Sequence, residues 1–403
     1  MIDALMSTYR RLLSSVTHST YRALFHTFNI ENRLTGLIGP RGTGKTTLLL
    51  QFISGKIDEL DRCFYVSLDN IFFARQPLIE FVNELYEIHG VRYFFLDEVH
   101  KYPNWDQELK NIYDSYPDVK VVFSGSSSID LIKGTYDLSR RGVIYRISGL
   151  SFREYLHFRG VVTRDPIAYE ALVSKKSTYE QELGATTMIR GYFKQYLRNG
   201  YYPFFMEDEK TYQQKLFQII EKTVFEDISN YYRLKTENLV YFKRILSYIA
   251  TIPPGDLNRN SIAKSIQLDY KTVQSYLRIL EETGLVSLLS SNRGGSAVLK
   301  AREKVYLENS NLYAAIAAQT GHEVNDGSIR EVFFVSMMRN AGKHVFYSTV
   351  GDFEVEGTVF EVGGRNKKIK QIEPNLGNAY LAKDDILYGN KYEIPLYLFG
   401  FLY

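Results

Sequence analysis

The chain has 403 residues, of which 45% are hydrophobic, so it can bury cores in roughly two to four domains. Its 49 Lys and Arg residues against 46 Asp and Glu give a formal charge of +3, which excludes an argument for nucleic-acid binding from bulk charge. The single cysteine, Cys63, excludes an intrachain disulfide framework, and no apolar run reaches the ~18 residues of a membrane helix, so we expect a cytoplasmic protein without a membrane partner.

An apolar run, a glycine-rich loop and a helical pattern follow one another near the N-terminus. Residues 34–38 predict a strand, and the next residues match the phosphate-loop pattern GxxxxGK[ST]. The candidate ATP-binding residues are Gly39, Pro40, Arg41, Gly42, Thr43, Gly44, Lys45, Thr46 and Thr47. Backbone N–H groups would surround the phosphates, Lys45 would reach the β- and γ-phosphates, and the Thr46 hydroxyl would bind Mg²⁺. The alternative is an ordinary turn, which the flanking strand and helix disfavour.

A second apolar run ends in two adjacent carboxylates. Residues 91–98 read Val-Arg-Tyr-Phe-Phe-Leu-Asp-Glu, which is typical of a buried strand with acids at its carboxyl end. We expect Asp97 to hold Mg²⁺ and Glu98 to polarise the attacking water as general base. The alternative is that both acids cap the helix that follows.

Strand and helix patterns alternate from about residue 34 to residue 147. The expected strands are Leu34–Ile38, Arg62–Leu68, Val91–Leu96, Val119–Phe123 and Val143–Ile147. This alternation predicts an α/β fold with a parallel sheet covered by helices on both faces. One strand-helix unit separates the two motifs and a further strand follows, which is the spacing of the additional-strand, catalytic-glutamate class of P-loop ATPases. We therefore expect the strand order 5-1-4-3-2.

Two more candidates lie beyond the fourth strand. Residues 124–128 read Ser-Gly-Ser-Ser-Ser, where Ser126 is our candidate sensor of the γ-phosphate or the attacking water, although such clusters also mark plain turns. Arg141 precedes the fifth strand, and an ATPase of this class needs a cation to neutralise transition-state charge, sometimes supplied by a neighbouring subunit. A solvated surface arginine is the alternative for Arg141.

Together these motifs resemble the prokaryotic AAA family ATP-binding proteins. The resemblance is carried by residues 39–46, 94–98, 123–128, 138–141 and 149–155. Family members carry an N-terminal AAA+ ATPase core and a C-terminal nuclease-like domain. The family pattern Leu-x-Gly-Arg aligns Arg141 with the family arginine and Arg140 with the family glycine. In the Pro-Leu-Ser-Phe-x-Glu pattern that follows, Gly149 replaces the usual proline. Residues 199–203, Asn-Gly-Tyr-Tyr-Pro, resemble the family's Gly-Gly-x-Pro lid motif, with Asn199 as a departure.

Three further parts are expected after the ATPase core, giving the boundaries 1–160, 161–250, 251–300 and 301–403. Residues 161–250 have polar helical patterns and are the expected lid, with one helix over Thr211–Ile228. Pro253-Pro254-Gly255 ends that region, and a helix-turn-helix followed by a hairpin predicts a winged helix. Its second helix offers Lys271 and Arg278 but also Glu281 and Glu282, so DNA contact is the minority alternative to bracing the lid. The phosphate contacts would be Arg293, Lys300, Arg302 and Lys304.

The last part resembles the acidic constellation of PD-(D/E)XK nucleases. Glu331 lies in a helix that we expect to open at Arg330, and a two-residue turn at Glu356-Gly357 would pair Asp352 with Glu361 across a hairpin. Such a pair is destabilising unless a metal or another cation lies between the carboxylates. The nuclease pattern requires a lysine where this chain has Gly363, although Arg365 or Lys367 could reach back. We therefore expect a nuclease-like scaffold without catalysis.

These residues predict an ATP-binding and ATP-hydrolysing AAA+ protein that acts as a nucleotide-driven switch, with Mg²⁺ as its metal. Two alternatives stay open, a DNA-binding ATPase that uses the winged helix and an ATP-regulated nuclease. A homo-oligomer is expected if Arg141 acts from a neighbouring subunit. The apolar C-terminus, residues 394–403, is expected to be a final buried strand or a docked tail.

Overall fold

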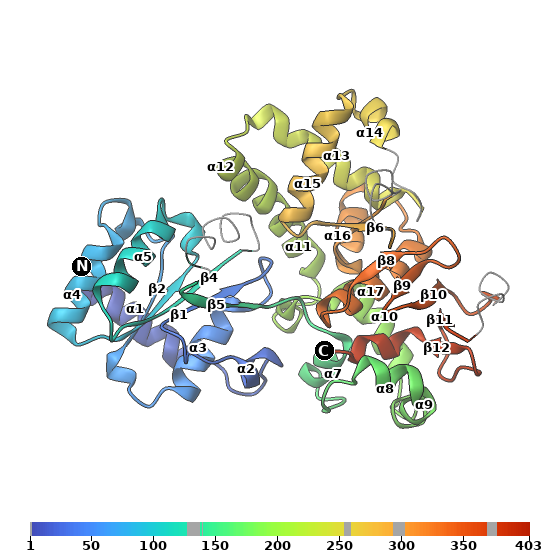
Figure 1. The fold of residues 1–403 in the computed structure, drawn as a ribbon, viewed down its shortest axis with the longest axis horizontal. Helices are drawn as coiled ribbons and strands as arrows, with labels where there is room; N and C mark the ends of the chain where they lie inside the picture. Colours follow the sequence, from blue (N-terminus) through green and yellow to red (C-terminus); the bar gives the residue numbers. More distant parts are fainter. Residues whose placement is uncertain (1, 127–137, 139, 254–258, 293–302, 369–376) are drawn as a thin grey trace. The chain divides into compact units, whose positions relative to one another are not determined.

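The computed structural model describes residues 2–126, 138, 140–253, 259–292, 303–368 and 377–403. The chain divides into two compact units, an N-terminal unit of Met1–Gly149 and a C-terminal unit of Leu150–Tyr403 (Figure 1). The N-terminal unit thus ends before the expected boundary at residue 160. The cause is α7 (Phe152–Phe158), which packs on the end of the chain: the rings of Phe152 and Phe401 lie 5.7 Å apart, and Arg153 Nε donates to the Tyr403 carbonyl at 2.9 Å.

A five-stranded parallel sheet forms the centre of the N-terminal unit. Its strands are β1 (Leu34–Ile38), β2 (Cys63–Ser67), β3 (Tyr93–Asp97), β4 (Lys120–Gly125) and β5 (Gly142–Arg146). The order across the sheet is β5-β1-β4-β3-β2 with parallel neighbours throughout, so the expected order is confirmed. The four strands other than β5 are almost entirely buried, as parallel strands covered on both faces are. Cys63 has the expected core role, and burial raises the pKa of its thiol to about 12.

The helices of this unit cover both faces of the sheet. They are α1 (Ile2–Ser15), α2 (Leu24–Thr27), α3 (Lys45–Lys56), α4 (Leu78–His89) and α5 (Trp105–Ser115), with 3₁₀ turns at Leu60–Arg62, Ile71–Ala74 and Val99–Lys101. The connection from β1 to β2 runs across the sheet in the opposite direction to those from β2 to β3 and from β3 to β4. Because such crossovers are right-handed, α3 lies on one face and α4 and α5 on the other, as Figure 1 shows.

Helices make up most of the C-terminal unit as far as residue 282. They are α7, α8 (Tyr169–Ser174), α9 (Lys176–Gly184), α10 (Ile189–Asn199), α11 (Tyr212–Lys222), α12 (Ser229–Tyr232), α13 (Thr236–Thr251), α14 (Arg259–Ile266) and α15 (Tyr270–Glu282), with a 3₁₀ turn at Pro203–Met206. The helix expected over Thr211–Ile228 is present, but its last part, Thr223–Ile228, is a π-helix. Within the described residues, no helix is long and apolar enough to cross a membrane.

A helix-turn-helix and a hairpin follow in the order that the sequence predicts. The turn between α14 and α15 contains Gln267 at φ 58°, and the side chain of Asp269 caps α15 by accepting from the Thr272 N–H at 3.0 Å. β6 (Val286–Ser290) and β7 (Glu303–Leu307) pair in antiparallel fashion. Residues 293–302 between them, with Arg293, Lys300 and Arg302, lie outside the described residues. The winged-helix assignment therefore stays a prediction.

Two helices and a second sheet complete the C-terminal unit. The elements are α16 (Ser310–Thr320), α17 (Asp326–Asn340), β8 (Val345–Tyr347), β9 (Phe353–Val355), β10 (Thr358–Gly363), β11 (Ala379–Lys383), β12 (Glu393–Pro395) and the 3₁₀ helix η9 (Leu396–Phe401). The sheet order is β12-β11-β10-β9-β8, with β8, β9 and β10 antiparallel and the others parallel. The end of the chain is therefore both a short strand and a buried helical tail.

Two local predictions in this region have different outcomes. The two-residue turn is confirmed, because Glu356 and Gly357 have φ of 49° and 78° and Val355 pairs with Thr358. The prediction that α17 opens at Arg330 is wrong. The helix begins at Asp326, since the Asn325 side chain accepts hydrogen bonds from the first turn, including the Gly327 N–H at 2.8 Å.

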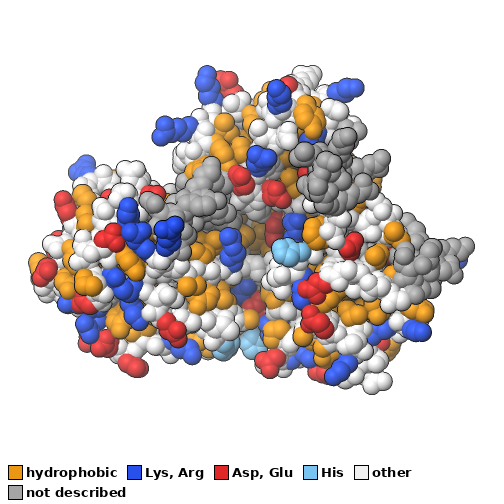
Figure 2. All heavy atoms as spheres, viewed as in Figure 1, with side chains coloured by type: hydrophobic (Ala, Val, Ile, Leu, Met, Phe, Trp, Pro, Cys, Tyr) orange, Lys and Arg blue, Asp and Glu red, His pale blue; other side chains and the backbone are white. Residues whose placement is uncertain are grey.

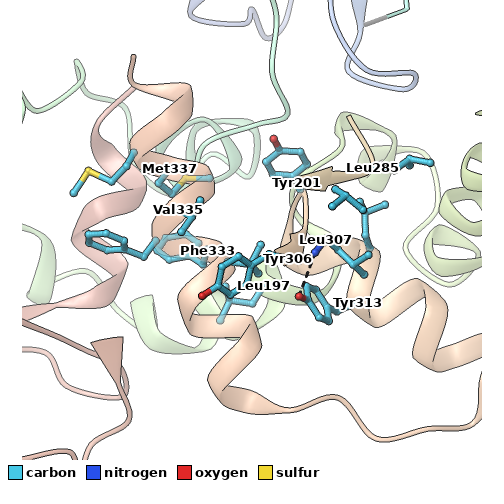
Figure 3. Packing of buried hydrophobic residues seen from close by; sticks show 14 of the residues in the cluster. Leu197, Tyr201, Leu285, Tyr306, Leu307, Tyr313, Phe333, Val335 and Met337 are labelled. Atoms are coloured by element: carbon cyan, nitrogen blue, oxygen red, sulfur yellow. Dashed lines mark hydrogen bonds between the residues drawn. The ribbon is translucent and has the colours of Figure 1, made fainter. Parts of the chain in front are cut away.

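One hydrophobic core runs through the C-terminal unit. Figure 3 shows side chains from α10, β7, α16 and α17 packed together, among them Leu197, Tyr306, Tyr313 and Phe333. The hydroxyl of Tyr313 accepts a hydrogen bond from the Leu307 N–H at 3.2 Å. The expected lid, winged helix and nuclease-like parts therefore share buried residues, and their separation as domains stays a prediction.

Candidate functional site

The phosphate-loop residues lie between β1 and α3, as the sequence predicts. Gly42 and Gly44 have φ of 79° and 90°, a left-handed backbone that residues with a Cβ rarely adopt, and α3 starts directly after Gly44. Lys45 Nζ donates to the carbonyls of Gly39 at 2.8 Å and Pro40 at 3.0 Å, so the ammonium group lies at the loop. Thr46 and Thr47 are exposed in the first turn of α3, and Arg41 is partly buried.

Arg22, which the sequence reasoning missed, is buried and fixes this loop from the N-terminal side. Its guanidinium donates to the Thr43 carbonyl at 2.6 Å and to the Ser148 carbonyl at 2.8 Å. The residue therefore ties the phosphate loop to the last residues of the N-terminal unit. No sequence pattern marks it, because an isolated arginine near an N-terminus is most often solvated.

Asp97 meets the phosphate loop at the carboxyl edge of the sheet. Its Oδ2 accepts from the Thr46 hydroxyl at 2.5 Å and from the Tyr65 hydroxyl at 2.8 Å, and its Oδ1 accepts from the Ser124 hydroxyl and from the Glu98 N–H at 3.0 Å. Burial, and then the charge of Asp97, raise the pKa of Tyr65, so that hydroxyl stays protonated and donates. The contact between Thr46 and Asp97 joins two motifs that are far apart in the sequence.

This arrangement fits a magnesium ion. Carboxylate and hydroxyl oxygens are the ligands that Mg²⁺ prefers, and Thr46 and Asp97 place one of each in contact beside the loop that would hold phosphates. Among the described residues, no group of three or more His, Cys, Asp or Glu side chains is arranged to hold a metal. The ion would therefore complete its coordination shell with nucleotide and water oxygens.

Glu98, His100 and Ser126 form a connected group at the same edge. Glu98 has a left-handed backbone with φ 52°, which is uncommon for a residue with a Cβ and turns the chain sharply after β3. His100 Nε2 lies 3.3 Å from Glu98 Oε2 and 3.3 Å from Ser126 Oγ. The structure therefore brings the candidate base and the candidate sensor together through a histidine that the sequence reasoning missed.

Arg141 lies at the other edge of the sheet. β5 is parallel to β1, and their register pairs Gly142 with Leu34 and Arg146 with Ile38. Because β1 spans about 13 Å at ~3.3 Å per residue, Arg141 lies that far along the sheet from the phosphate loop. Its Nε is 3.5 Å from Asp114 Oδ1. This placement disfavours action on a nucleotide in the same chain.

The three nuclease-like carboxylates also gather, inside the C-terminal unit. Lys304 Nζ lies 3.7 Å from Glu331 Oε2 and 3.7 Å from Asp352 Oδ1, and Lys367 Nζ forms an ion pair with Glu361. Phe353 pairs with Phe360 in the hairpin, and Asp352 lies one residue before Phe353, next to Glu361 on the other strand. The Oδ2 atom of Asp352 accepts a hydrogen bond from the Val362 N–H at 2.8 Å. Glu361 is almost fully buried.

The two lysines settle two expectations from the sequence. Lys367 does reach back to the second acid, as one alternative had it. The expectation that Lys304 contacts DNA phosphate is wrong, because its side chain is only 12% exposed and lies between two carboxylates. Burial, followed by the charge of Asp352, raises the pKa of Glu331 to about 7, and the same two causes raise that of Glu361.

Two family models match this sequence. Residues 31–156 match an AAA domain, and residues 190–323 match a domain of unknown function (DUF8612). The N-terminal unit therefore has an AAA-type P-loop fold. No curated protein matches the sequence significantly.

Solved structures with some similarity include three proteins. PCH-2 from C. elegans is 18% identical, with 45% of this chain and 54% of PCH-2 covered at a TM-score of 0.26. AMPPCP-bound DnaA from Aquifex aeolicus is 19% identical over 68% of this chain and 86% of DnaA, at a TM-score of 0.27. A single-substitution variant of RuvB from Thermotoga maritima is 15% identical over 74% of this chain and 93% of RuvB, at a TM-score of 0.26.

Proposed function

We propose that this protein binds ATP with Mg²⁺ in its N-terminal unit and hydrolyses it, using the nucleotide cycle to move the rest of the chain. The observation that carries this proposal is the 2.5 Å contact between the Thr46 hydroxyl and the Asp97 carboxylate. The two side chains come from the AAA-type phosphate loop and from the end of β3, and ATP hydrolysis requires both at one metal ion.

Each residue has a distinct task in this proposal. The loop N–H groups and Lys45 hold the phosphates, and Thr46 and Asp97 hold the metal ion, which would neutralise phosphate charge. Glu98 accepts a proton from the attacking water as the bond between the γ-phosphorus and the bridging oxygen breaks, which gives ADP and phosphate. Ser126 contacts the γ-phosphate.

A thermal-shift titration together with a phosphate-release assay tests this proposal. At about one hundred times the dissociation constant, ATP with Mg²⁺ should stabilise the N-terminal unit by roughly 2.7 kcal/mol. Lys45→Ala should lose this shift, and Glu98→Gln should keep it but lose turnover. Lys56→Ala, an exposed lysine at the other end of α3, is the matched control and should behave as wild type. A normal shift in Lys45→Ala would contradict the assignment of the loop.

A second function is DNA binding by α15. The observation that favours it is that Glu281 and Glu282 form hydrogen bonds with neighbouring elements. Glu282 Oε2 accepts from the Tyr232 hydroxyl at 2.5 Å, and Glu281 Oε1 accepts from the Leu288 N–H at 3.1 Å. Both acids are therefore tied to neighbouring elements. The exposed face of α15 carries Lys271, Gln274, Ser275 and Arg278, which recur at the spacing of one helix face. Glu281 still lines the same surface pocket as Gln274 and Arg278, so the case for DNA rests on the exposed Lys271 and Arg278.

The case for DNA is local, because basic and acidic side chains are interspersed over the face shown in Figure 2. A titration with duplex DNA at several salt concentrations tests it. Replacing Lys271 and Arg278 by alanine should weaken binding and lower the salt slope by about 2. Lys194→Ala with Arg198→Ala on α10 removes the same charge and should leave binding unchanged. Equal weakening by both pairs would mean that only bulk charge matters.

The C-terminal carboxylates are proposed to be catalytically silent. Lys304 and Lys367 already neutralise two of them, and Gly363 occupies the position where nuclease catalysis requires a lysine. Incubation with linear, circular and single-stranded DNA plus Mg²⁺ or Mn²⁺ should give no cleavage. Cleavage that disappears in Glu361→Ala would overturn this and support an ATP-regulated nuclease.

A further inference from the structure

One histidine lies between the candidate base and the candidate sensor. The His100 side chain is only 4% exposed, and its Nε2 is 3.3 Å from an oxygen of Glu98 and 3.3 Å from the hydroxyl of Ser126. His100 belongs neither to the phosphate-loop motif nor to the pair of acids at the end of β3, so neither motif explains its position.

The fold explains why these three side chains meet. β3 and β4 are neighbours and parallel, so the residues after their carboxyl ends, Glu98 and Ser126, emerge at the same edge. The left-handed turn at Glu98 leads into the 3₁₀ turn Val99–Lys101, which is closed by the Lys101 N–H donating to the Glu98 carbonyl at 2.9 Å. His100 is the central residue of that turn. Its ring is thereby directed back to the edge instead of continuing the strand.

The Nε2 atom of His100 faces both Glu98 and Ser126, and the position of the ring proton limits which hydrogen bonds it can form. When Nε2 carries a proton, it can donate to the Glu98 carboxylate, and the Ser126 hydroxyl then donates to another acceptor. When the proton is on Nδ1, Nε2 accepts from Ser126 and presents a lone pair to Glu98, which repels the carboxylate. Only the Nε2–H form can bind Glu98, and the Ser126 oxygen can accept the same hydrogen, so the two partners compete for one N–H.

We propose that His100 is a positioning residue that couples contact with the γ-phosphate at Ser126 to the position of Glu98. A γ-phosphate oxygen accepts the hydrogen of Ser126, which leaves His100 Nε2 to donate to Glu98 and hold it against the attacking water. After phosphate leaves, the Ser126 oxygen competes with Glu98 for the same Nε2–H, so Glu98 is held less firmly and no proton has to move between the ring nitrogens. The proposal rests on ATP hydrolysis by this site and adds the means by which the base is held more firmly when ATP is present.

Steady-state ATP hydrolysis by three single variants tests the proposal. His100→Leu removes the donor and should lower kcat by roughly 10- to 100-fold while KM stays within about 3-fold, because the phosphate loop is untouched. His100→Gln keeps an N–H that can reach Glu98 and should recover to within about 5-fold of wild type. His89→Leu, on the exposed last turn of α4, is the matched control and should match wild type. If the leucine variant does not fold, His100→Asn, whose amide is too short to reach Glu98, replaces it.

A double variant tells whether His100 and Ser126 act on Glu98 together or affect kcat independently. His100→Leu combined with Ser126→Ala should lose no more kcat than the slower single variant, because both changes break one connected group. Additive losses, an unchanged kcat in His100→Leu, or a glutamine variant as slow as the leucine variant would each overturn the role of His100. If wild-type protein hydrolyses no ATP, the proposed function fails and this role with it. If wild type is active and His100→Leu equally so, only the role of His100 fails.

Discussion

The two units of this molecule bury carboxylates in opposite chemical surroundings. In the N-terminal unit, Asp97 accepts hydrogen bonds from hydroxyls of Thr46, Tyr65 and Ser124 and from a backbone N–H. In the C-terminal unit, the carboxylate cluster of Glu331, Asp352 and Glu361 is paired with Lys304 and Lys367. The first set of donors is neutral, whereas the second set includes two ammonium groups beside the neutral Tyr306 hydroxyl and Val362 N–H.

This difference decides which site can take a cation. Neutral donors stabilise a carboxylate without cancelling its charge, so we expect the Asp97 carboxylate to attract Mg²⁺. An ammonium group cancels the charge that it contacts. The carboxylate cluster has three acids against two lysines, and the pKa of about 7 at Glu331 allows a proton to balance the remaining charge near neutral pH. Burial of acids alone therefore does not indicate a metal site.

The largest expected effect comes from removing the charge of Asp97. Asp97→Asn keeps the shape and an acceptor but lacks the charge that holds the metal, and a metal supplies several kcal/mol of transition-state stabilisation. At about 1.4 kcal/mol per tenfold, ATP turnover should fall on the order of 10⁴-fold. Asp352→Asn is the same substitution in the carboxylate cluster and should leave turnover within about 2-fold. A comparable loss of ATP turnover in both variants would contradict the proposed difference between Asp97 and the carboxylate cluster.

We expect a second cation to reach the proposed ATP site from another copy of the chain. Arg141 lies at the edge of the sheet opposite the phosphate loop, so we expect it to act on a neighbouring subunit's nucleotide and not within its own chain. Arg141→Ala should lower turnover about 10³-fold, at the low end for arginine fingers, while ATP affinity stays within a few fold. Mixing this variant with Lys45→Ala protein should restore part of the turnover.

Arg146 is the alternative source of this cation. The register with Ile38 places it at the edge of the sheet that carries the phosphate loop. If Arg146→Ala loses turnover and Arg141→Ala keeps the wild-type rate, the cation acts within one chain and the role of Arg141 must be dropped.

The sequence was sufficient for features that a motif or a local pattern specifies. Strand periodicity and the two motifs predicted the order of the sheet and the meeting of Thr46 with Asp97, since the carboxyl ends of parallel strands share one edge. The turn at Glu356-Gly357 was predictable for the same reason, because its two residues alone decide it.

Contacts between distant elements could not be predicted where no motif marks the residues. Tyr65 donates to Asp97 from the adjacent strand, and a hydroxyl within the otherwise apolar run of β2 was the one available signal. Lys304 looked like a DNA contact, but its place on β7 brings it beside α17. The direction of Glu281 and Glu282 depends on which face of α15 packs, and the sequence of one helix does not fix its partners.

Removing an internal cation from the carboxylate cluster should destabilise the folded chain. Lys304→Met keeps the apolar stem but leaves Glu331 and Asp352 without their shared ammonium group, so the free energy of unfolding should fall by about 3–5 kcal/mol. Without nucleotide, Mg²⁺ should then stabilise this variant more than wild type, because the carboxylate cluster gains a net negative charge. Lys264→Met, an exposed lysine on α14, is the control. Equal stabilisation of wild type and variant by Mg²⁺ would show that the built-in lysines do not exclude the ion.

The smallest expected effect is a pH dependence that belongs to the carboxylate cluster alone. Glu331 has its pKa raised from 4.5 to about 7 by burial and by Asp352, while Lys304 and the Tyr306 hydroxyl at 2.5 Å oppose the shift, and Glu361 adds to it. Below about pH 4.5 the group is protonated in both the folded and unfolded chain, so its contribution to stability is complete. As the pH rises to about 7, the unfolded chain releases the proton first and stability is lost, by at most about 3 kcal/mol.

Urea unfolding of the full chain between pH 4.5 and 8 measures this loss. Glu331→Gln resembles the protonated carboxyl and keeps an acceptor for Tyr306, so its stability should no longer fall across the window. Glu323→Gln, an exposed residue before α17, should retain the wild-type slope. If Glu331→Gln keeps that slope, the proton does not reside on Glu331, and the internal balance of charge that distinguishes the carboxylate cluster from Asp97 must come from another group.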